Sequence, residues 1–410
     1  MLRFMLDLIV KSQGPGGPTP WPGDALSVGP DGLALDGVPL GPLAHRLGTP
    51  LYVYGAATIG RRLDALQGAL AGTGRPFVIR YAMKSCRFGP VLDLVRARGH
   101  AIDACSPREV ELALRHGFGP DQVSLTAGML SNRDLATVAR LGVRPNLDTF
   151  SALTRWAATP GHGRSVGLRI NPEVAVGYAP GLAYGNAKFG FDQERVLEAA
   201  AHARRLGLEV EEVHMHLGWN LPRGTALGVR HAFRALAELA AELGTVRTVD
   251  VGGGLGWPHR VDDDPLPLEI WAEIVGEALA DLDPAIEVAC EPGTYVMAAS
   301  GALVVEVNTL EERRSGTWLG VDAGHAVNVY PAHYRVPFFV VPVDAPLRPP
   351  VQHVHLGGNI NEANDVFAHD LPLPEVQEGD LLALWPAGAY GSSMASDHCL
   401  RGQPGEVLVG

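Results

Sequence analysis

The 410-residue sequence is short of positive charge. Its 33 Lys and Arg residues stand against 45 Asp and Glu residues, which gives a formal net charge of -12 at pH 7. A surface that binds duplex nucleic acid needs a clustered excess of Lys and Arg to neutralise the phosphates. We therefore expect no nucleic-acid partner.

Cysteines are few and scattered. The four of them, Cys86, Cys105, Cys290 and Cys399, include no C-x-x-C pair. This spacing indicates neither a structural zinc site nor a disulfide framework, so we expect no bound metal and a reducing, cytoplasmic location.

Long uncharged apolar stretches are also absent. The opening MLRFMLDLIV is interrupted by Asp7 and is followed by a Gly- and Pro-rich stretch without a small-residue cleavage site. We therefore expect an irregular N-terminus and not a signal peptide. No other apolar run reaches the roughly 20 residues that a membrane-spanning helix needs, so we expect no membrane partner.

Short apolar runs alternate with amphipathic stretches from residue 77 onward. This alternation is typical of βα units around a parallel sheet. Several of the amphipathic stretches end at a glycine, where a helix C-terminus favours one, and Ser106, Pro107 and Glu109 predict a capping box at the start of one helix. The expected strands are FVIRYA (77–82), HAID (100–103), QVSLTA (122–127), VRPNLD (143–148), VGLRIN (166–171), VEEVHMHL (210–217), TVDVGG (248–253) and IEVACE (286–291).

Eight such units, preceded by a helical pattern at residues 57–72, predict an α/β fold with a (β/α)8 TIM barrel. Helical periodicity ends near residue 301, and apolar runs between Gly and Pro turns then predict a C-terminal β-rich sandwich or barrel domain. We expect three parts. Residues 1–48 form an N-terminal segment that partly joins the β domain, residues 49–300 form the barrel, and residues 301–410 form the β domain.

Polar side chains collect where the predicted strands end. In a TIM barrel the chemistry lies at the carboxyl ends of the strands, so polar residues at these positions are candidate site residues. They are Lys84, Asp103, Asp148, Arg169, His214, His216, Asp250, the three glycines Gly252 to Gly254, and Glu291.

The combination of these residues points to one cofactor. Three successive glycines, Gly252 to Gly254, follow the seventh strand, and backbone N–H groups free of side chains can approach a phosphate closely there. A lysine at the same end can form a Schiff base, and a carboxylate such as Glu291 can keep a pyridine nitrogen protonated. Together these groups indicate a barrel that binds pyridoxal 5'-phosphate.

A metal-dependent hydrolase is the rival interpretation. His214 and His216 are two residues apart on a predicted strand and so face the same side, where Asp103, Asp250 or Glu291 could complete a metal site. This interpretation leaves the three glycines unexplained. In the cofactor interpretation His214 needs no chemical role and can be a packed histidine.

Five segments also resemble a known family: YAMK with Lys84, HMHLG with His216, DVGGG, EPG with Glu291, and GDLLALWPAGAYG. Their order is similar, from about Thr49 to Leu400, to that in the fold-type III pyridoxal phosphate decarboxylases, which share the alanine-racemase-like fold. Diaminopimelate decarboxylase is the nearest member, and ornithine and arginine decarboxylases are more distant.

The resemblance implies a carboxy-lyase that removes carbon dioxide from a small-molecule amino-acid substrate. In this family the lysine corresponding to Lys84 forms the Schiff base, the histidine corresponding to His216 stacks on the ring, and the glutamate corresponding to Glu291 pairs with the ring nitrogen. Asp103 and Arg169 match residues that support the histidine and the side of the ring. The phosphate contacts match Gly252, Gly253, Gly254, Gly293 and Tyr390. The family is dimeric, so the resemblance implies a homodimer whose active sites lie at the interface and are completed by the partner's C-terminal domain.

Departures from the family motifs concern the substrate. The family has Ser at the position of Trp219 and arginines at those of Thr294 and Tyr330. Two arginines that would bind a second carboxylate are therefore missing. A phenol or a hydroxyl binds a carboxylate far less well than the two-pronged guanidinium group of an arginine does. The family's C-E-S-G-D segment corresponds to residues 361–365. Asn361 thus replaces the proton-donating cysteine, and we expect Lys84, His325 or another group to supply the proton.

The expected substrate-binding residues are Tyr330, Asn361, Glu362 and Asp365. By resemblance, Glu362 faces the distal amine of the substrate. The first interpretation is a diaminopimelate-type decarboxylase. The second is a decarboxylase of a related diamino acid or of a polyamine or siderophore precursor, such as carboxynorspermidine or a diaminopropionate conjugate. A non-catalytic pyridoxal phosphate-binding regulator is a third interpretation.

Overall fold

A computed structural model describes residues 21–178, 184–185 and 187–410. The expected irregular N-terminus at residues 1–20 lies outside the described residues. The chain divides into two compact units. The barrel unit comprises Arg62–Trp257 and Asp264–Tyr295, and the β unit comprises the described residues up to Arg61 together with Pro258–Asp263 and Val296–Gly410.

The predicted barrel is confirmed. Eight parallel strands close in the order β10-β11-β12-β5-β6-β7-β8-β9, and each coincides with one of the eight expected runs. The strands are β5 (Phe77–Ala82), β6 (Ala101–Ala104), β7 (Val123–Thr126), β8 (Pro145–Leu147), β9 (Ser165–Ile170), β10 (Glu209–Met215), β11 (Thr248–Asp250) and β12 (Glu287–Cys290).

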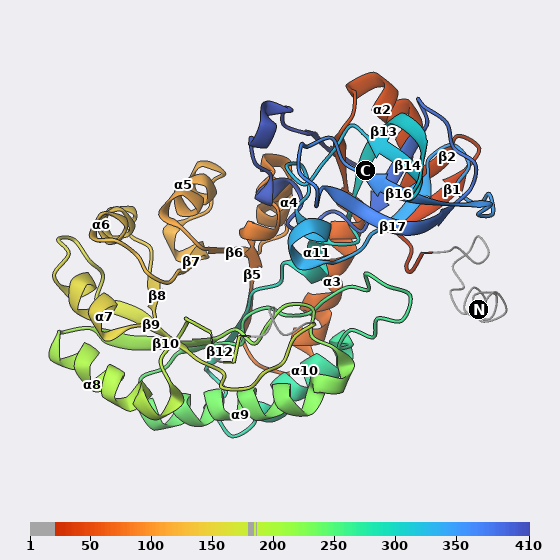
Figure 1. Cartoon of the computed structure of the whole chain (residues 1–410). Coiled ribbons are helices and arrows are strands. Elements are labelled where there is room, and N and C mark those ends of the chain that lie inside the picture. The colour runs from red at the N-terminus through yellow and green to blue at the C-terminus, as the bar shows by residue number, and fades with distance from the viewer. Residues whose placement is uncertain (1–20, 179–183, 186) are drawn as a thin grey trace. The chain divides into compact units, whose positions relative to one another are not determined.

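Helices lie outside these strands (Figure 1). They are α4 (Gly89–Ala97), α5 (Pro107–Arg115), α6 (Asn132–Leu141), α7 (Phe150–Ala157), α8 (Val196–Arg205), α9 (Ala226–Leu243) and α10 (Leu268–Ala278), and the division between the units falls inside α3 (Ala56–Ala71). Each presents an apolar stripe to the strands, such as Val229, Phe233 and Leu236 on α9, which are fully buried. No helix in the described part of the chain is long and apolar enough to cross a membrane.

The start of α5 differs in one detail from the predicted capping box. The Ser106 side chain accepts a hydrogen bond from the Glu109 N–H at 3.2 Å, as expected for an N-cap. The Glu109 carboxylate, however, accepts from the N–H of Cys105 at 2.7 Å and not from that of Ser106. The reciprocal bond is displaced by one residue and still satisfies a backbone donor beside the site strand β6.

The β unit contains the predicted C-terminal β-rich domain. Its main sheet has the order β15-β18-β13-β14-β16-β17, and β4 pairs with both β13 and β19. Residues 26–47 add a small antiparallel sheet and a helix to this unit. The strand β4 also belongs to the β unit, whereas the sequence analysis assigned residues 49–300 to the barrel. The elements are β1 (Leu26–Gly29), β2 (Gly32–Leu35), β3 (Val38–Pro39), α2 (Leu40–Leu47), β4 (Leu51–Gly55), β13 (Gly301–Arg313), β14 (Gly316–Val321), β15 (Phe339–Pro342), β16 (Gln352–Gly357), β17 (Val366–Leu373), β18 (Leu381–Trp385) and β19 (Gly405–Val409).

Candidate functional site

The barrel topology gathers the predicted polar residues at one end of the strands. Parallel strands in a closed barrel place all their carboxyl ends on the same face. Lys84 lies in a short 3-10 helix directly after β5, and Glu291 directly follows β12. Asp103, Arg169, His214 and Asp250 lie at or next to the last residues of β6, β9, β10 and β11, and His216 directly follows β10.

Lys84 and Asp103 form an ion pair at this end of the barrel. The Lys84 Nζ lies 2.9 Å from Asp103 Oδ2, and the lysine side chain is one-third exposed whereas the aspartate is fully buried. Burial, together with the nearby Glu291 charge, raises the pKa of Asp103 to about 6 despite the attraction of Lys84. The other oxygen, Oδ1, is buried without a hydrogen-bond partner among the described residues. This arrangement leaves the lysine amine partly exposed and oriented by a carboxylate.

The glycine loop after β11 fits a phosphate cradle. Gly252 has a φ of +69°, and a Cβ there would lie 2.4 Å from the Met215 carbonyl oxygen. A Cβ on Gly253 would lie 2.4 Å from the carbonyl oxygen of Glu291. Side chains are thus excluded by backbone on both sides, which lets the loop backbone approach a phosphate closely. In this structure the N–H groups of Gly252 and Gly253 donate to Asp250 and His216. The next glycine in the series, Gly254, has a φ of +110°.

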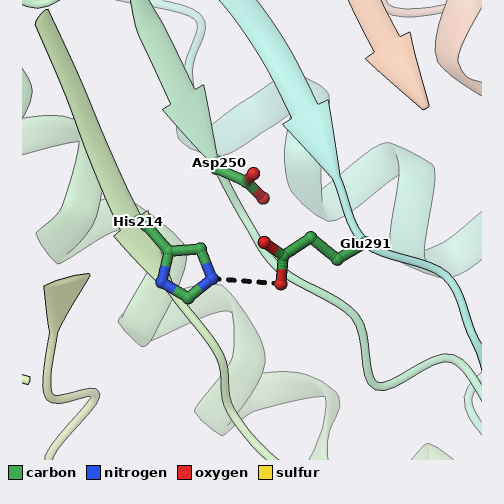
Figure 2. Close-up of side chains that lie close together, drawn as sticks. All are labelled: His214, Asp250 and Glu291. Carbon is green, nitrogen blue, oxygen red and sulfur yellow. Dashed lines mark hydrogen bonds and ion pairs between the residues drawn. The ribbon is translucent and has the colours of Figure 1, made fainter. Parts of the chain in front are cut away.

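Glu291 and His214 form the centre of the buried cluster (Figure 2). His214 Nε2 lies 3.1 Å from Glu291 Oε2, and the side chains are 0% and 2% exposed. Thr126 Oγ1 lies 3.3 Å from the other carboxylate oxygen of Glu291. Burial lowers the pKa of His214 to about 4, so this imidazole is neutral near pH 7.

The structure separates the two histidines of the rival metal hypothesis. Ligand atoms of His214, Asp250 and Glu291 lie within 4.8 Å of one another and could hold a metal ion, and no such group in the described part of the chain includes His216. His216 instead accepts a hydrogen bond at Nδ1 from the Gly253 N–H at 3.2 Å. The Asp250 oxygens already accept from Arg80 at 2.7 Å and from the Gly252 N–H at 2.8 Å.

Aromatic residues accompany His216 and Arg169. The His216 ring lies edge-on to Tyr184, with 4.9 Å between centroids, and Tyr184 stacks on Phe189. The Arg169 guanidinium lies 4.4 Å above the Phe189 ring. Burial, with Lys84 and Arg169 nearby, holds the pKa of His216 well below its usual range, so its ring is neutral and suited to stacking on a flat cofactor. Sequence analysis did not identify Tyr184 or Phe189, because an aromatic residue in a loop carries no strand-end signal.

A buried charge network lies deeper in the barrel. Arg80, in the middle of β5, donates two hydrogen bonds to Glu212 at 2.7 and 2.8 Å and one to Asp250 at 2.7 Å. Burial opposes ionisation of Glu212, yet Arg80 and Arg144 hold its pKa at about 2. Burial and the charge of Glu291 raise the pKa of Asp250 to about 7. Sequence analysis missed this network, although a charged residue inside an apolar strand run is the signal that would have indicated it.

The predicted substrate-binding residues and Tyr390 lie in the β unit. Tyr330 is buried and stacks on Tyr390, with 6.3 Å between ring centroids. Glu362 is half-exposed and pairs with His398 at 3.2 Å. The buried Asp365 accepts hydrogen bonds from the N–H groups of His325 and Ile360 at 2.6 and 2.7 Å. It therefore holds the loop that presents the exposed Asn361 and Glu362, and a direct contact of Asp365 with substrate stays a prediction.

The raised pKa of Asp103 predicts that this site residue destabilises the cofactor-free protein at neutral pH. Its folded-state pKa of about 6 exceeds the ordinary value of 3.8 for an aspartate side chain. Its stabilising contribution is therefore complete below about pH 4 and is lost as the pH rises through about 6. Asp103→Asn imitates the protonated form, so we expect it to raise the free energy of unfolding at pH 7.5 by on the order of 2 kcal/mol and to change it little at pH 4.5.

Urea unfolding of the cofactor-free protein between pH 4.5 and 8 tests this expectation. Asp64→Asn is the control, because Asp64 is 62% exposed and pairs with Arg98 at the surface, where an ion pair contributes no more than about 1 kcal/mol. A wild-type protein more stable than Asp103→Asn at pH 7.5 would contradict the prediction.

Comparisons with known proteins agree with this geometry. Residues 56–298 match the family model "Pyridoxal-dependent decarboxylase, pyridoxal binding domain". The chain is 33% identical to a diaminopimelate decarboxylase from Methanothermobacter thermautotrophicus, over 92% of this chain and 90% of that one. It is 32% identical to the diaminopimelate decarboxylase of Streptomyces coelicolor, over 92% and 88%. The crystal structure of diaminopimelate decarboxylase from Helicobacter pylori complexed with L-lysine superposes with a TM-score of 0.83 at 27% identity, covering 90% of this chain and 93% of that one.

Proposed function

The chain belongs to the family of pyridoxal-dependent decarboxylases, and we propose that it decarboxylates a diamino acid whose far end differs from that of diaminopimelate. It is a carboxy-lyase that acts on an amino acid with pyridoxal 5'-phosphate as its cofactor. The observation that supports the assignment of the site is the grouping of Lys84, the glycine loop and Glu291 at one end of the barrel strands.

The residues at that end fit the cofactor. Lys84, with its amine held 2.9 Å from Asp103, would bind it covalently. Gly252, Gly253 and Gly254 would hold the phosphate, as would Gly293, which directly follows Glu291 and Pro292. By resemblance to the family, Tyr390 is a further candidate phosphate contact.

When bound, pyridoxal phosphate supplies an electron sink for the electrons released as the bond between Cα and the carboxylate breaks. Glu291 would hold a proton at the ring nitrogen. The neutral His216 ring would stack on the cofactor, and Arg169 would support the side of the ring. Because these charges and rings are oriented before the reaction, little reorganisation is needed in the transition state.

The proton that replaces the lost carboxylate needs a donor other than residue 361. The amide of Asn361 cannot supply it. We propose Lys84 or His325 for this step. His325 Nδ1 lies 3.7 Å from Asp365 Oδ1, and its ring stacks on that of His398 with 5.8 Å between centroids.

The residues expected to bind the far end of the substrate differ from the family motifs. Thr294 and Tyr330 stand where relatives with two-carboxylate substrates have arginines, and Tyr330 packs its ring against Tyr390. A phenol and a hydroxyl bind a carboxylate far less well than a guanidinium fork does. Glu362 presents a half-exposed carboxylate, which supports recognition of a distal amine. These features favour a substrate with a distal amine and without a second carboxylate at that point.

Release of carbon dioxide from a substrate panel tests the proposal. The panel contains diaminopimelate, lysine, ornithine, arginine, carboxynorspermidine and a citryl-diaminopropionate conjugate, with Lys84→Ala holoprotein as the background. We expect kcat/KM for another member to exceed that for diaminopimelate by about a hundredfold, the loss expected when an arginine–carboxylate pair of about 3 kcal/mol is absent. Diaminopimelate as the best substrate would contradict the proposal. If the protein binds the cofactor but decarboxylates no compound of the panel, the result would favour a non-catalytic regulator that binds pyridoxal phosphate.

We also propose a homodimer in the cytoplasm, with substrate sites at the interface. All four cysteines are free thiols, which supports a reducing compartment. Light scattering of the holoenzyme is expected to give twice the mass of the chain, and a single chain's mass would contradict the dimer.

A further inference from the structure

His214 carries a feature that packing alone does not explain. It lies on β10 between the buried residues Val213 and Met215 and is completely buried. Its Nδ1 has no hydrogen-bond partner among the described residues. A buried ring nitrogen without a partner is unfavourable, and an apolar side chain would fill the same space without that penalty. A functional role would explain why a histidine stands here.

The chemistry of the His214 contact determines which group donates. Burial keeps the imidazole neutral near pH 7, and a neutral imidazole has a single N–H. A lone pair on Nε2 would repel the Glu291 carboxylate, which lies 3.1 Å away. The proton therefore lies on Nε2, and His214 donates to Glu291 Oε2.

The Thr126 hydroxyl contacts the other oxygen of the Glu291 carboxylate. Thr126 Oγ1 lies 3.3 Å from Glu291 Oε1 and accepts a hydrogen bond from Asn146 Nδ2 at 2.9 Å. Because Thr126 accepts from Asn146, its own hydroxyl proton is free to donate to Glu291. Asn146 Nδ2 also lies 2.9 Å from Glu212, the partner of Arg80. The Glu291 carboxylate is thus held at both oxygens by groups anchored in the barrel interior.

Two other carboxylates interact with the charge of Glu291. Asp103 and Asp250 are fully buried carboxylates, and the charge of Glu291 contributes to raising the pKa of each. The contacts with His214 and Thr126 fix the position of both Glu291 oxygens beside these two carboxylates.

We propose that His214, assisted by Thr126, is a positioning residue that holds the Glu291 carboxylate oriented toward the cofactor's ring nitrogen. This inference rests on the proposed function of Glu291. It assigns to the first histidine of the HMH segment a role that acts through Glu291 and not by contact with substrate.

The test compares two ligands that differ only at the ring nitrogen. Cofactor-free protein is titrated with pyridoxal phosphate and with the carbocyclic analogue in which carbon replaces that nitrogen. Wild-type protein is expected to prefer pyridoxal phosphate by at least tenfold, and Glu291→Gln is expected to abolish the preference. His214→Phe removes the donor and should reduce the preference about tenfold, the effect of a hydrogen bond to a charged group. His214→Gln retains an N–H donor and should largely preserve it.

The preference ratio separates a positioning role from a structural one. A general loss of packing would weaken both ligands equally and leave the ratio unchanged. His100→Phe is the matched control, since His100 is also a buried barrel histidine and no hydrogen bond links it to Glu291. We expect the wild-type ratio for this variant.

Each outcome has one interpretation. Equal binding of the two ligands by wild-type protein would overturn the proposed role of Glu291 itself. A wild-type preference that Glu291→Gln abolishes but His214→Phe leaves intact would overturn the inference about His214. If His214→Phe does not fold, Thr126→Val removes the second donor with little change of shape. It should reduce the preference about threefold or more, and an unchanged ratio would overturn the proposal.

Discussion

Replacing Lys84 by alanine is expected to lower the decarboxylation rate by about 10³-fold or more, the scale seen when a covalent catalytic group is removed. The proposed covalent link to the cofactor needs a primary amine at this position. The substitution also leaves the fully buried Asp103 without the cation that lies 2.9 Å away in the native protein. Steady-state release of carbon dioxide from the best panel substrate measures the loss.

The lysine content of the chain makes the covalent link easy to locate. The sequence contains three lysines, Lys11, Lys84 and Lys188. Borohydride reduction of the holoprotein followed by peptide mass spectrometry is expected to place the cofactor on the Lys84 peptide alone. Lys84→Arg is the matched control, because it keeps the positive charge beside Asp103 but supplies no primary amine, and it should be as inactive as Lys84→Ala. Labelling at Lys188, or an active Lys84→Arg enzyme, would contradict the assignment.

Replacing Arg80 by methionine is expected to lower the free energy of unfolding of the barrel by about 3–5 kcal/mol, the usual effect of breaking a buried ion pair. Arg80 is 8% exposed, and both of its carboxylate partners, Glu212 and Asp250, are 0% exposed. Methionine fills a similar volume but leaves two buried carboxylates without this cation. Urea unfolding of the cofactor-free protein, followed by circular dichroism, measures the change.

Two further variants isolate the effect of the buried charge. Arg247→Met removes an ion pair with Glu211, the neighbour of Glu212 on β10, but the Arg247 side chain is 80% exposed. We expect a change of no more than about 1 kcal/mol, as for surface pairs. Adding Glu212→Gln to Arg80→Met should recover part of the lost stability, since it removes one of the two buried negative charges that Arg80 compensates, although Arg144 also pairs with Glu212. Equal effects of Arg80→Met and Arg247→Met would show that the buried network contributes no more than a surface pair.

Local patterns explain why the barrel could be predicted. Each strand is a short apolar run between polar stretches, and the alternation of strand and helix restricts the sheet to a parallel one. A parallel barrel in turn places every strand end on one face. This rule alone predicts that Lys84, Asp103 and Glu291 belong to the site, without knowledge of their contacts.

Boundaries and caps were less predictable. The β4 strand (Leu51–Gly55) is apolar like the barrel strands, yet it pairs with β13 and β19 in the β unit. An apolar run indicates a strand but not the sheet that it joins. The displaced capping bond of Glu109 has the same origin, because its geometry depends on the path of the chain before Ser106.

The sequence by itself determined the strands, their order around the barrel and the end at which the polar groups gather, because these follow from periodicity and from the handedness of βα units. Only the tertiary structure decided which polar groups pair. Glu291 meets His214 across 77 residues and Thr126 across 165, and Arg80 meets Glu212 across 132. Strand alternation places a side chain inside the barrel, but the partner opposite it depends on register and closure, which no local pattern encodes. The sequence therefore left His214 as either a packing residue or a metal ligand, whereas the fold places its Nε2 3.1 Å from Glu291 Oε2.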